Sequence, residues 1–250
     1  MITEGTFLYF CLLHLTFLAA GLVKGVTGMG LPTVAMGVLA TVVPPALAAA
    51  ILVIPSLATN VWQFLMGSAT SRLLRRLWPM MLGVVVGTLG GSVLLVRVDP
   101  LWSGFALGLA LVAYAAYALV SPSLSVPPPI EPWLSPLVGL LTGTITGATG
   151  VFVLPAVPYL QALRLDKDEL VQVLGLSFTV STIALAAGLL MHDAFRLDHL
   201  GQSVVAVVPA FVGMWLGQRI RARISPQRFR QCFLLFLGLL GLEQATRPFI

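Results

Sequence analysis

The sequence predicts an all-α, polytopic membrane protein with about 8–10 membrane segments in two inverted repeats, each opening with a broken, glycine-rich helix pair. The chain of 250 residues is 58% hydrophobic and only 9% charged, whereas soluble domains carry about 25% charged residues. Apolar runs of roughly 20 residues recur along the chain, as a bilayer about 30 Å thick requires. Motifs of the first half also recur in the second, which indicates an internal repeat.

The apolar segments form two groups of five. They cover about 7–23, 33–43, 45–66, 77–96 and 101–120 in the first half, and about 134–148, 151–163, 168–190, 200–219 and 231–246 in the second. The connection between the groups, SPSLSVPPPIEPWLSP, contains prolines that cannot continue a helix. We therefore predict a first transmembrane repeat over 1–120, a connector over 121–133 and a second transmembrane repeat over 134–250.

Four motifs occur in the same order in both halves. GLVKGVTGMG (Gly21–Gly30) matches GLLTGTITGATG (Gly139–Gly150), PSLATN (Pro55–Asn60) matches LSFTVS (Leu176–Ser181), PMMLGVVVG (Pro79–Gly87) matches PAFVGMWLG (Pro209–Gly217), and DP at 99–100 matches SP at 225–226. Their common order predicts that each half folds as one structural repeat.

Positive charges place the two repeats in opposite orientations. Three arginines lie between 72 and 76, but the equivalent connection of the second half, 191–200, has one. One connection later the bias reverses, because region 97–100 has one arginine and region 219–230 has five. Short basic loops stay in the cytoplasm. Equivalent loops are therefore expected on opposite sides of the membrane, as in the inverted repeats of secondary transporters.

Glycine clusters interrupt the opening segments of each half, with Gly28 and Gly30 in the first cluster and Gly147 and Gly150 in the second. In each half we expect the first two segments to be short, so that they either cross as thin, tilted helices or enter and return as a hairpin. In both cases the irregular backbone must be enclosed by protein or line a wet cavity. Helices that restart after such breaks direct a partial positive charge at the cavity, which suits an anion.

Lys24 is the candidate anion ligand at the first break. A lysine in mid-bilayer costs roughly 3 kcal/mol on insertion scales, so it is a functional candidate by default. The alternative is that Lys24 ends a full first span and extends to the lipid headgroups. Thr27 beside it, and Thr142 and Thr146 in the second half, supply hydroxyls for an oxyanion; alternatively, they hydrogen-bond neighbouring helices.

Further polar residues lie inside long spans at matching repeat positions. Asn60 and Gln63 are three residues apart and share a helical face, as do Ser177 and Ser181, which are four apart. These side chains either face the substrate cavity or bond between helices. His14 is the histidine that lies well inside a span, so it is the candidate for proton coupling, unless it is merely packed.

Composition also bears on the other function classes. The net charge of +5 resides mostly in short connections and reports membrane orientation, not nucleic-acid binding. We predict no metal and no cofactor. The predicted partners are a small anionic substrate and the lipid bilayer, with a homodimer as a further assembly. The alternatives to a transporter are a membrane-embedded enzyme, which would need paired catalytic groups, and a structural membrane subunit without transport activity.

Together these motifs resemble the TauE/SafE permeases, often called sulfite exporters. The resemblance rests on GLVKGVTGMG, on GLLTGTITGATG followed by VFVLPAVPYL, and on the P-x-x-x-G-x-x-x-G spans, and it extends from about Phe10 to Leu242. It implies a bacterial inner-membrane transporter for sulfite, an organosulfonate, or a related sulfur oxyanion or carboxylate. This chain has GMGLP and GATG where typical members carry denser glycine runs, a departure that concerns the substrate more than transport.

Overall fold

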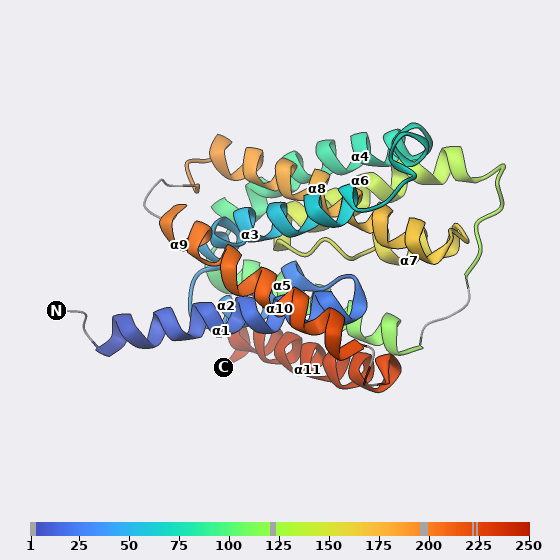
Figure 1. Ribbon diagram of the computed structural model, residues 1–250. Coiled ribbons are helices and arrows are strands. Elements are labelled where there is room, and N and C mark those ends of the chain that lie inside the picture. The colour runs from blue at the N-terminus through green and yellow to red at the C-terminus, as the bar shows by residue number, and fades with distance from the viewer. Residues whose placement is uncertain (1–3, 121–123, 196–199, 222, 224) are drawn as a thin grey trace.

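The computed structural model describes residues 4–120, 124–195, 200–221, 223 and 225–250, and every regular element in these ranges is a helix (Figure 1). The helices of the first half are α1 (Glu4–Thr27), α2 (Leu31–Leu39), α3 (Pro45–Leu65), α4 (Thr70–Arg97) and α5 (Pro100–Val120). Those of the second half are α6 (Glu131–Thr149), α7 (Ala156–Ala162), α8 (Lys167–Met191), α9 (Leu200–Val205), α10 (Val207–Arg221) and α11 (Pro226–Thr246), followed by the 3-10 helix η2 (Arg247–Phe249). The predicted all-α class is confirmed.

Within the described ranges, six helical segments are long and apolar enough to cross a bilayer: Leu8–Thr27, Pro45–Leu65, Thr70–Arg97, Pro100–Val120, Lys167–Met191 and Leu200–Arg221. At 1.5 Å per residue, α2 and α7 are only about 14 and 10 Å long, so neither can span. The expectation that both members of each opening pair are short is wrong for the first members, because α1 has 24 residues and α6 has 19.

The surface and interior have the distribution expected of a protein surrounded by lipid. Large apolar side chains are exposed on the long helices, among them Leu82 and Val86 of α4 and Val208 of α10. Polar side chains are fully buried instead, including Asn60 of α3 and Ser177 of α8. Since polar groups inside a membrane bundle pack towards its interior, this arrangement supports a multi-pass membrane protein.

Two helix pairs pack closely through glycines, and each pair joins the two halves of the chain. A Cβ atom added to Gly21 of α1 would overlap the carbonyl oxygen of Ala210 in α10, and one added to Gly139 of α6 would overlap that of Met80 in α4. Ala210 and Met80 occupy the same position in the two matching P-x-x-x-G-x-x-x-G motifs. Small residues let helix backbones approach in this way, so the repeated motif specifies the same contact twice.

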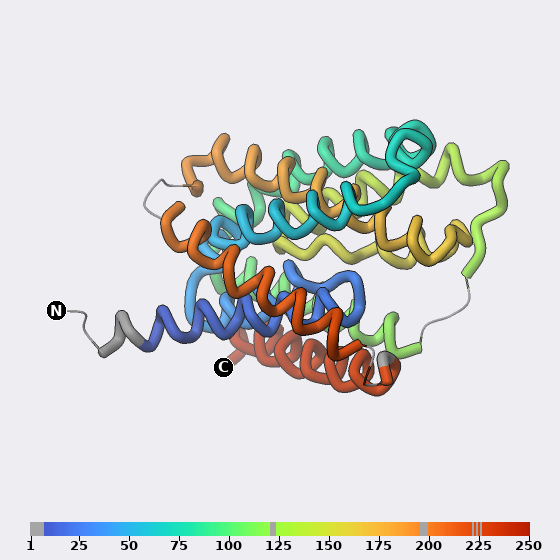
Figure 2. Tube along the Cα trace, in the orientation of Figure 1, coloured from blue at the N-terminus to red at the C-terminus, as the bar shows by residue number. Residues whose placement is uncertain are grey.

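The helices form two layers (Figure 1). One layer contains α3, α4, α6, α7 and α8, and the other contains α1, α2, α5, α10 and α11. Each first-half helix runs opposite to its second-half counterpart, as α1 and α6 or α3 and α8 show. The chain reverses direction after α1 and again after α6, and Figure 2 shows that these two reversals point towards opposite ends of the bundle.

Candidate functional site

Lys24 lies in the last turn of α1 and is buried, with 2% of its surface exposed. Its ammonium donates hydrogen bonds to Asn60 Oδ1 and, over 3.3 Å, to Thr59 Oγ1, both on α3. The bonds therefore cross from one layer to the other. This geometry contradicts the alternative in which Lys24 extends to the lipid headgroups.

A directed chain of hydrogen bonds continues from Lys24 into α8. Asn60 Nδ2 donates to Ser56 Oγ over 2.9 Å, and Ser56 Oγ lies 3.2 Å from Thr182 Oγ1. Thr182 gives its own proton to the carbonyl oxygen of Phe178 at 2.6 Å, so Ser56 must be the donor in the bond between them. Sequence reasoning missed the roles of Ser56, Thr59 and Thr182, although the first two lie within a matched polar motif and Thr182 directly follows the other.

Both described hydrogen-bond partners of the Lys24 ammonium are neutral oxygens. An ammonium has three donors, and the described structure gives partners to two of them. The ion pairs found among the described residues join arginines to glutamates at the surface and do not include Lys24. A buried charge without a counter-charge is costly. The site therefore favours an anion at Lys24.

Three predicted hydroxyls are buried without a hydrogen-bond partner in the described structure. These are Thr142 of α6 and Ser177 and Ser181 of α8. By the motif matches, they correspond to Lys24, Ser56 and Asn60 of the first half. The second half therefore places hydroxyl groups at the positions where the first half has its bonded lysine, serine and asparagine.

The two chain breaks have similar geometry but different lengths. Gly28 and Gly30 after α1, and Gly150 after α6, have positive φ angles of 81°, 103° and 70° that glycine adopts without strain. Thr27 Oγ1 accepts from the Met29 N–H at 3.3 Å, and in the same pattern Thr149 Oγ1 accepts from the Val151 N–H at 3.2 Å. Threonine hydroxyls thus satisfy backbone groups at both breaks.

Gly147 does not lie at the second break, where the sequence places it, whereas Thr146 contacts the backbone that follows the break. Gly147 is inside α6, where an added Cβ would overlap the carbonyl oxygen of Thr88, so it is a helix-packing glycine and does not form the break. Thr146 is buried and donates to the Val151 carbonyl at 3.3 Å. The correction for Gly147 has a simple cause: α6 continues to Thr149, and the second break begins at Gly150. The predicted role of Thr146 at the anion site stays a prediction.

Gln63 and His14 have separate environments. Gln63 Nε2 donates to the carbonyl oxygens of Gly28, at 2.9 Å, and Val171, at 2.7 Å, and so ties the first break to α3 and α8. His14 Nδ1 lies 2.7 Å from the Phe10 carbonyl of its own helix. Ten residues of helix, about 15 Å, separate His14 from Lys24. His14 therefore lies outside the hydrogen-bonded chain of Lys24, and its coupling role stays a prediction.

A cavity of about 280 Å³ adjoins the first break. Residues of α1, α5, α7, α8, α10 and α11 line it, together with Met29 between α1 and α2. Its cationic lining residues are Lys167, Arg221 and Arg230. Sequence reasoning used the arginines only to orient the chain, so it missed this cavity; the clustered basic residues were the available signal.

The sequence model of the sulfite exporter TauE/SafE family matches residues 13–243. The chain belongs to this family. No significant match to a curated protein or to a solved structure accompanies it. As a TauE/SafE protein it is a multi-pass membrane transporter of the exporter type and not an enzyme, which removes the predicted enzymatic alternative.

Proposed function

We propose that this TauE/SafE protein is a secondary transporter that moves a small anion across the bacterial inner membrane by alternating access. The substrate classes we propose are sulfite, an organosulfonate, or a related sulfur oxyanion or carboxylate. The observation that carries the proposal is Lys24, a buried ammonium whose described partners are all neutral. A bound anion supplies the missing counter-charge and an acceptor for the third donor.

The internal symmetry supports alternating access. The α1–α10 and α6–α4 contacts use equivalent glycines, and equivalent helices run in opposite directions (Figure 1). We infer an inverted repeat from these two features, with repeats over 1–120 and 134–250. Rocking of two such halves around a fixed site is a general way to open that site to each side in turn. In this fold the two bundles that would rock are the layers, each of which contains helices of both repeats, and the Lys24–Asn60 bond joins one layer to the other.

The proposed partners of the protein are the anion and the lipid bilayer. The described residues give no support for a homodimer. A thermal-shift screen in detergent tests the ligand class directly. Small oxyanions, sulfonates and carboxylates should include ligands that raise the melting temperature, since a ligand at 100 times its Kd stabilises by about 2.7 kcal/mol. Choline chloride serves as the cationic control. Failure of every anion to stabilise folded protein, and to exchange across proteoliposomes, would overturn the proposed substrate classes.

Orientation gives a second prediction. The start of α4, the end of α10 and the start of α11, which carry the arginines of 72–76 and of 219–230, lie at the same end of the bundle, opposite the ends of α4 and α8 (Figure 1). We expect tags inserted at both arginine-rich ends to report the cytoplasm, because basic short loops are retained there. Tags at Asp99 and at 193–198, a stretch whose last three residues lie outside the described residues, should report the periplasm. Finding Asp99 and the 219–230 region on one side would contradict the inverted repeat.

A further inference from the structure

The basic cavity beside the first break, defined by Lys167, Arg221 and Arg230, is separate from Lys24. It is lined by Val26, Thr27 and Met29 from the end of α1 and the break, whereas Lys24 is not part of its lining. The residues of α1 that line the cavity therefore follow Lys24 in the chain, and the Lys24 side chain is bonded to α3 instead. An ion in this cavity would be next to the break but outside the Lys24 site.

The charged residues in the described lining of the cavity are all basic. Its described lining includes three cationic side chains and no carboxylate. Arg230 is held at the wall by a hydrogen bond of 2.9 Å from its Nη2 to the Ala118 carbonyl at the end of α5. Positive charge concentrated in a concave, partly apolar site raises the local concentration of anions. The electrostatics of the cavity therefore favour a negatively charged group.

The remaining walls add an apolar component and hydrogen-bond donors. Leu170, Leu174 and Phe233 line the cavity alongside the cations, and Tyr114 donates its hydroxyl to the Met29 sulfur at 3.4 Å, a weak acceptor. Sulfite has one sulfur and three oxygens, whereas the 280 Å³ of this cavity equals about nine waters at roughly 30 Å³ each. The volume therefore accommodates carbon atoms as well as a charged head.

We propose that the basic cavity is a second anion site, which takes an organic anion with a sulfonate or carboxylate head and a short apolar chain. The head lies among the three cations and the chain packs against the leucines and Phe233. This inference rests on the proposed transport function for its role, which is to collect the substrate at the arginine-rich end before it reaches Lys24. Binding to the cavity itself does not depend on transport.

The test is calorimetric binding of sodium alkanesulfonates, from methane- to butanesulfonate, to the full chain in nanodiscs of zwitterionic lipid, with empty nanodiscs subtracted. Affinity should rise up to about fourfold per added methylene as each is buried. Arg221→Gln and Lys167→Gln should each weaken butanesulfonate binding by about tenfold, because a charge-assisted hydrogen bond is lost. Lys167 is exposed, so its replacement leaves folding intact.

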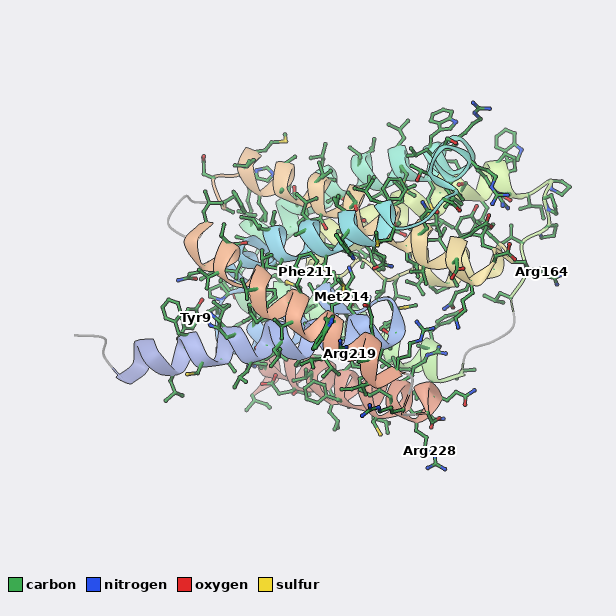
Figure 3. All side chains as sticks on the ribbon, in the orientation of Figure 1. Tyr9, Arg164, Phe211, Met214, Arg219 and Arg228 are labelled. Carbon is green, nitrogen blue, oxygen red and sulfur yellow. The ribbon has the colours of Figure 1, made fainter. Side chains whose placement is uncertain are left out.

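Two further variants separate the possible results. Arg228→Gln removes the same charge from the same end of the protein, but Arg228 points away from the bundle (Figure 3), so binding should be unchanged. In Lys24→Gln the affinity for alkanesulfonates should still rise with chain length, even where transport is lost. This variant therefore separates failure of the cavity proposal from failure of the transport proposal. Affinity independent of chain length, equal losses in Arg228→Gln and Arg221→Gln, or loss of binding in Lys24→Gln would each overturn the second site.

Discussion

Replacing Lys24 by glutamine should weaken anion binding and transport by on the order of a hundredfold or more, because breaking a buried charge pair costs about 3–5 kcal/mol. Glutamine keeps the length and some hydrogen bonding to Asn60 and Thr59 but removes the charge. Lys24→Arg should recover only part of the activity, since a planar guanidinium does not reproduce the compact ammonium. The measurement is anion uptake into proteoliposomes at matched protein content.

The same substitution should have the opposite effect on the substrate-free protein. Lys24 is buried among neutral partners, so its removal relieves the desolvation of an unpaired charge. Lys24→Gln should therefore unfold at a higher temperature than the parent in buffer that lacks binding anions. A residue needed only for packing would lower that temperature instead.

Thr16→Val is the matched control on α1. The Thr16 hydroxyl is buried and without a partner in the described structure, and it lies eight residues before Lys24. Its loss should leave anion affinity unchanged. Thr27→Val and Thr146→Val should each weaken anion binding by on the order of 1 kcal/mol, because each removes a hydrogen bond that holds the backbone near a break. Full transport by a well-expressed Lys24→Gln protein would show that Lys24 does not bind the substrate.

The burial of Lys24 illustrates what the sequence can predict. One lysine in an apolar stretch beside glycines is an unusual local pattern, and its functional interpretation needs no knowledge of other helices. The hydrogen-bond partners of Lys24 cannot be predicted in this way. The step from Asn60 through Ser56 to Thr182 depends on how closely α3 approaches α8, and many packings satisfy the same hydrophobic pattern. The motif matches brought these segments into correspondence but did not place them in contact.

Gly147 shows a more specific limit. Gly139, Gly143 and Gly147 are spaced by four, which is the spacing of one helical face, and all three would overlap α4 backbone if they carried a Cβ. Sequence reasoning assigned Gly147 to the break because it lies in a glycine-rich motif. The spacing already contained the better signal: glycines four apart indicate helix packing, whereas Gly150, which follows Thr149 outside this series, ends the helix.

The α4 helix offers a direct test of this packing, because it contains two glycines with opposite surroundings. An added Cβ at Gly87 would overlap the carbonyl oxygen of Leu140 and lie 2.7 Å from the Thr144 nitrogen, whereas at Gly90 nothing lies within 4 Å. Gly87→Ala should therefore destabilise the protein by about 1–3 kcal/mol or more, since the obstacle is rigid backbone. Gly90→Ala should be neutral or stabilise by up to about 1 kcal/mol through helix propensity.

The equivalent glycine in the second half tests whether the two repeats use the same helix contact. Gly217 of α10 corresponds to Gly87, and an added Cβ there would overlap the carbonyl oxygen of Leu22 in α1. If the two cross-repeat pairs are equivalent, Gly217→Ala should destabilise as Gly87→Ala does. Thermal unfolding in one detergent, followed by the fraction that stays monodisperse, measures all three variants. A large loss in Gly90→Ala, or none in Gly87→Ala and Gly217→Ala, would contradict the helix contacts. A loss at only one of the last two would contradict their equivalence, because the repeated glycines would then hold unlike interfaces.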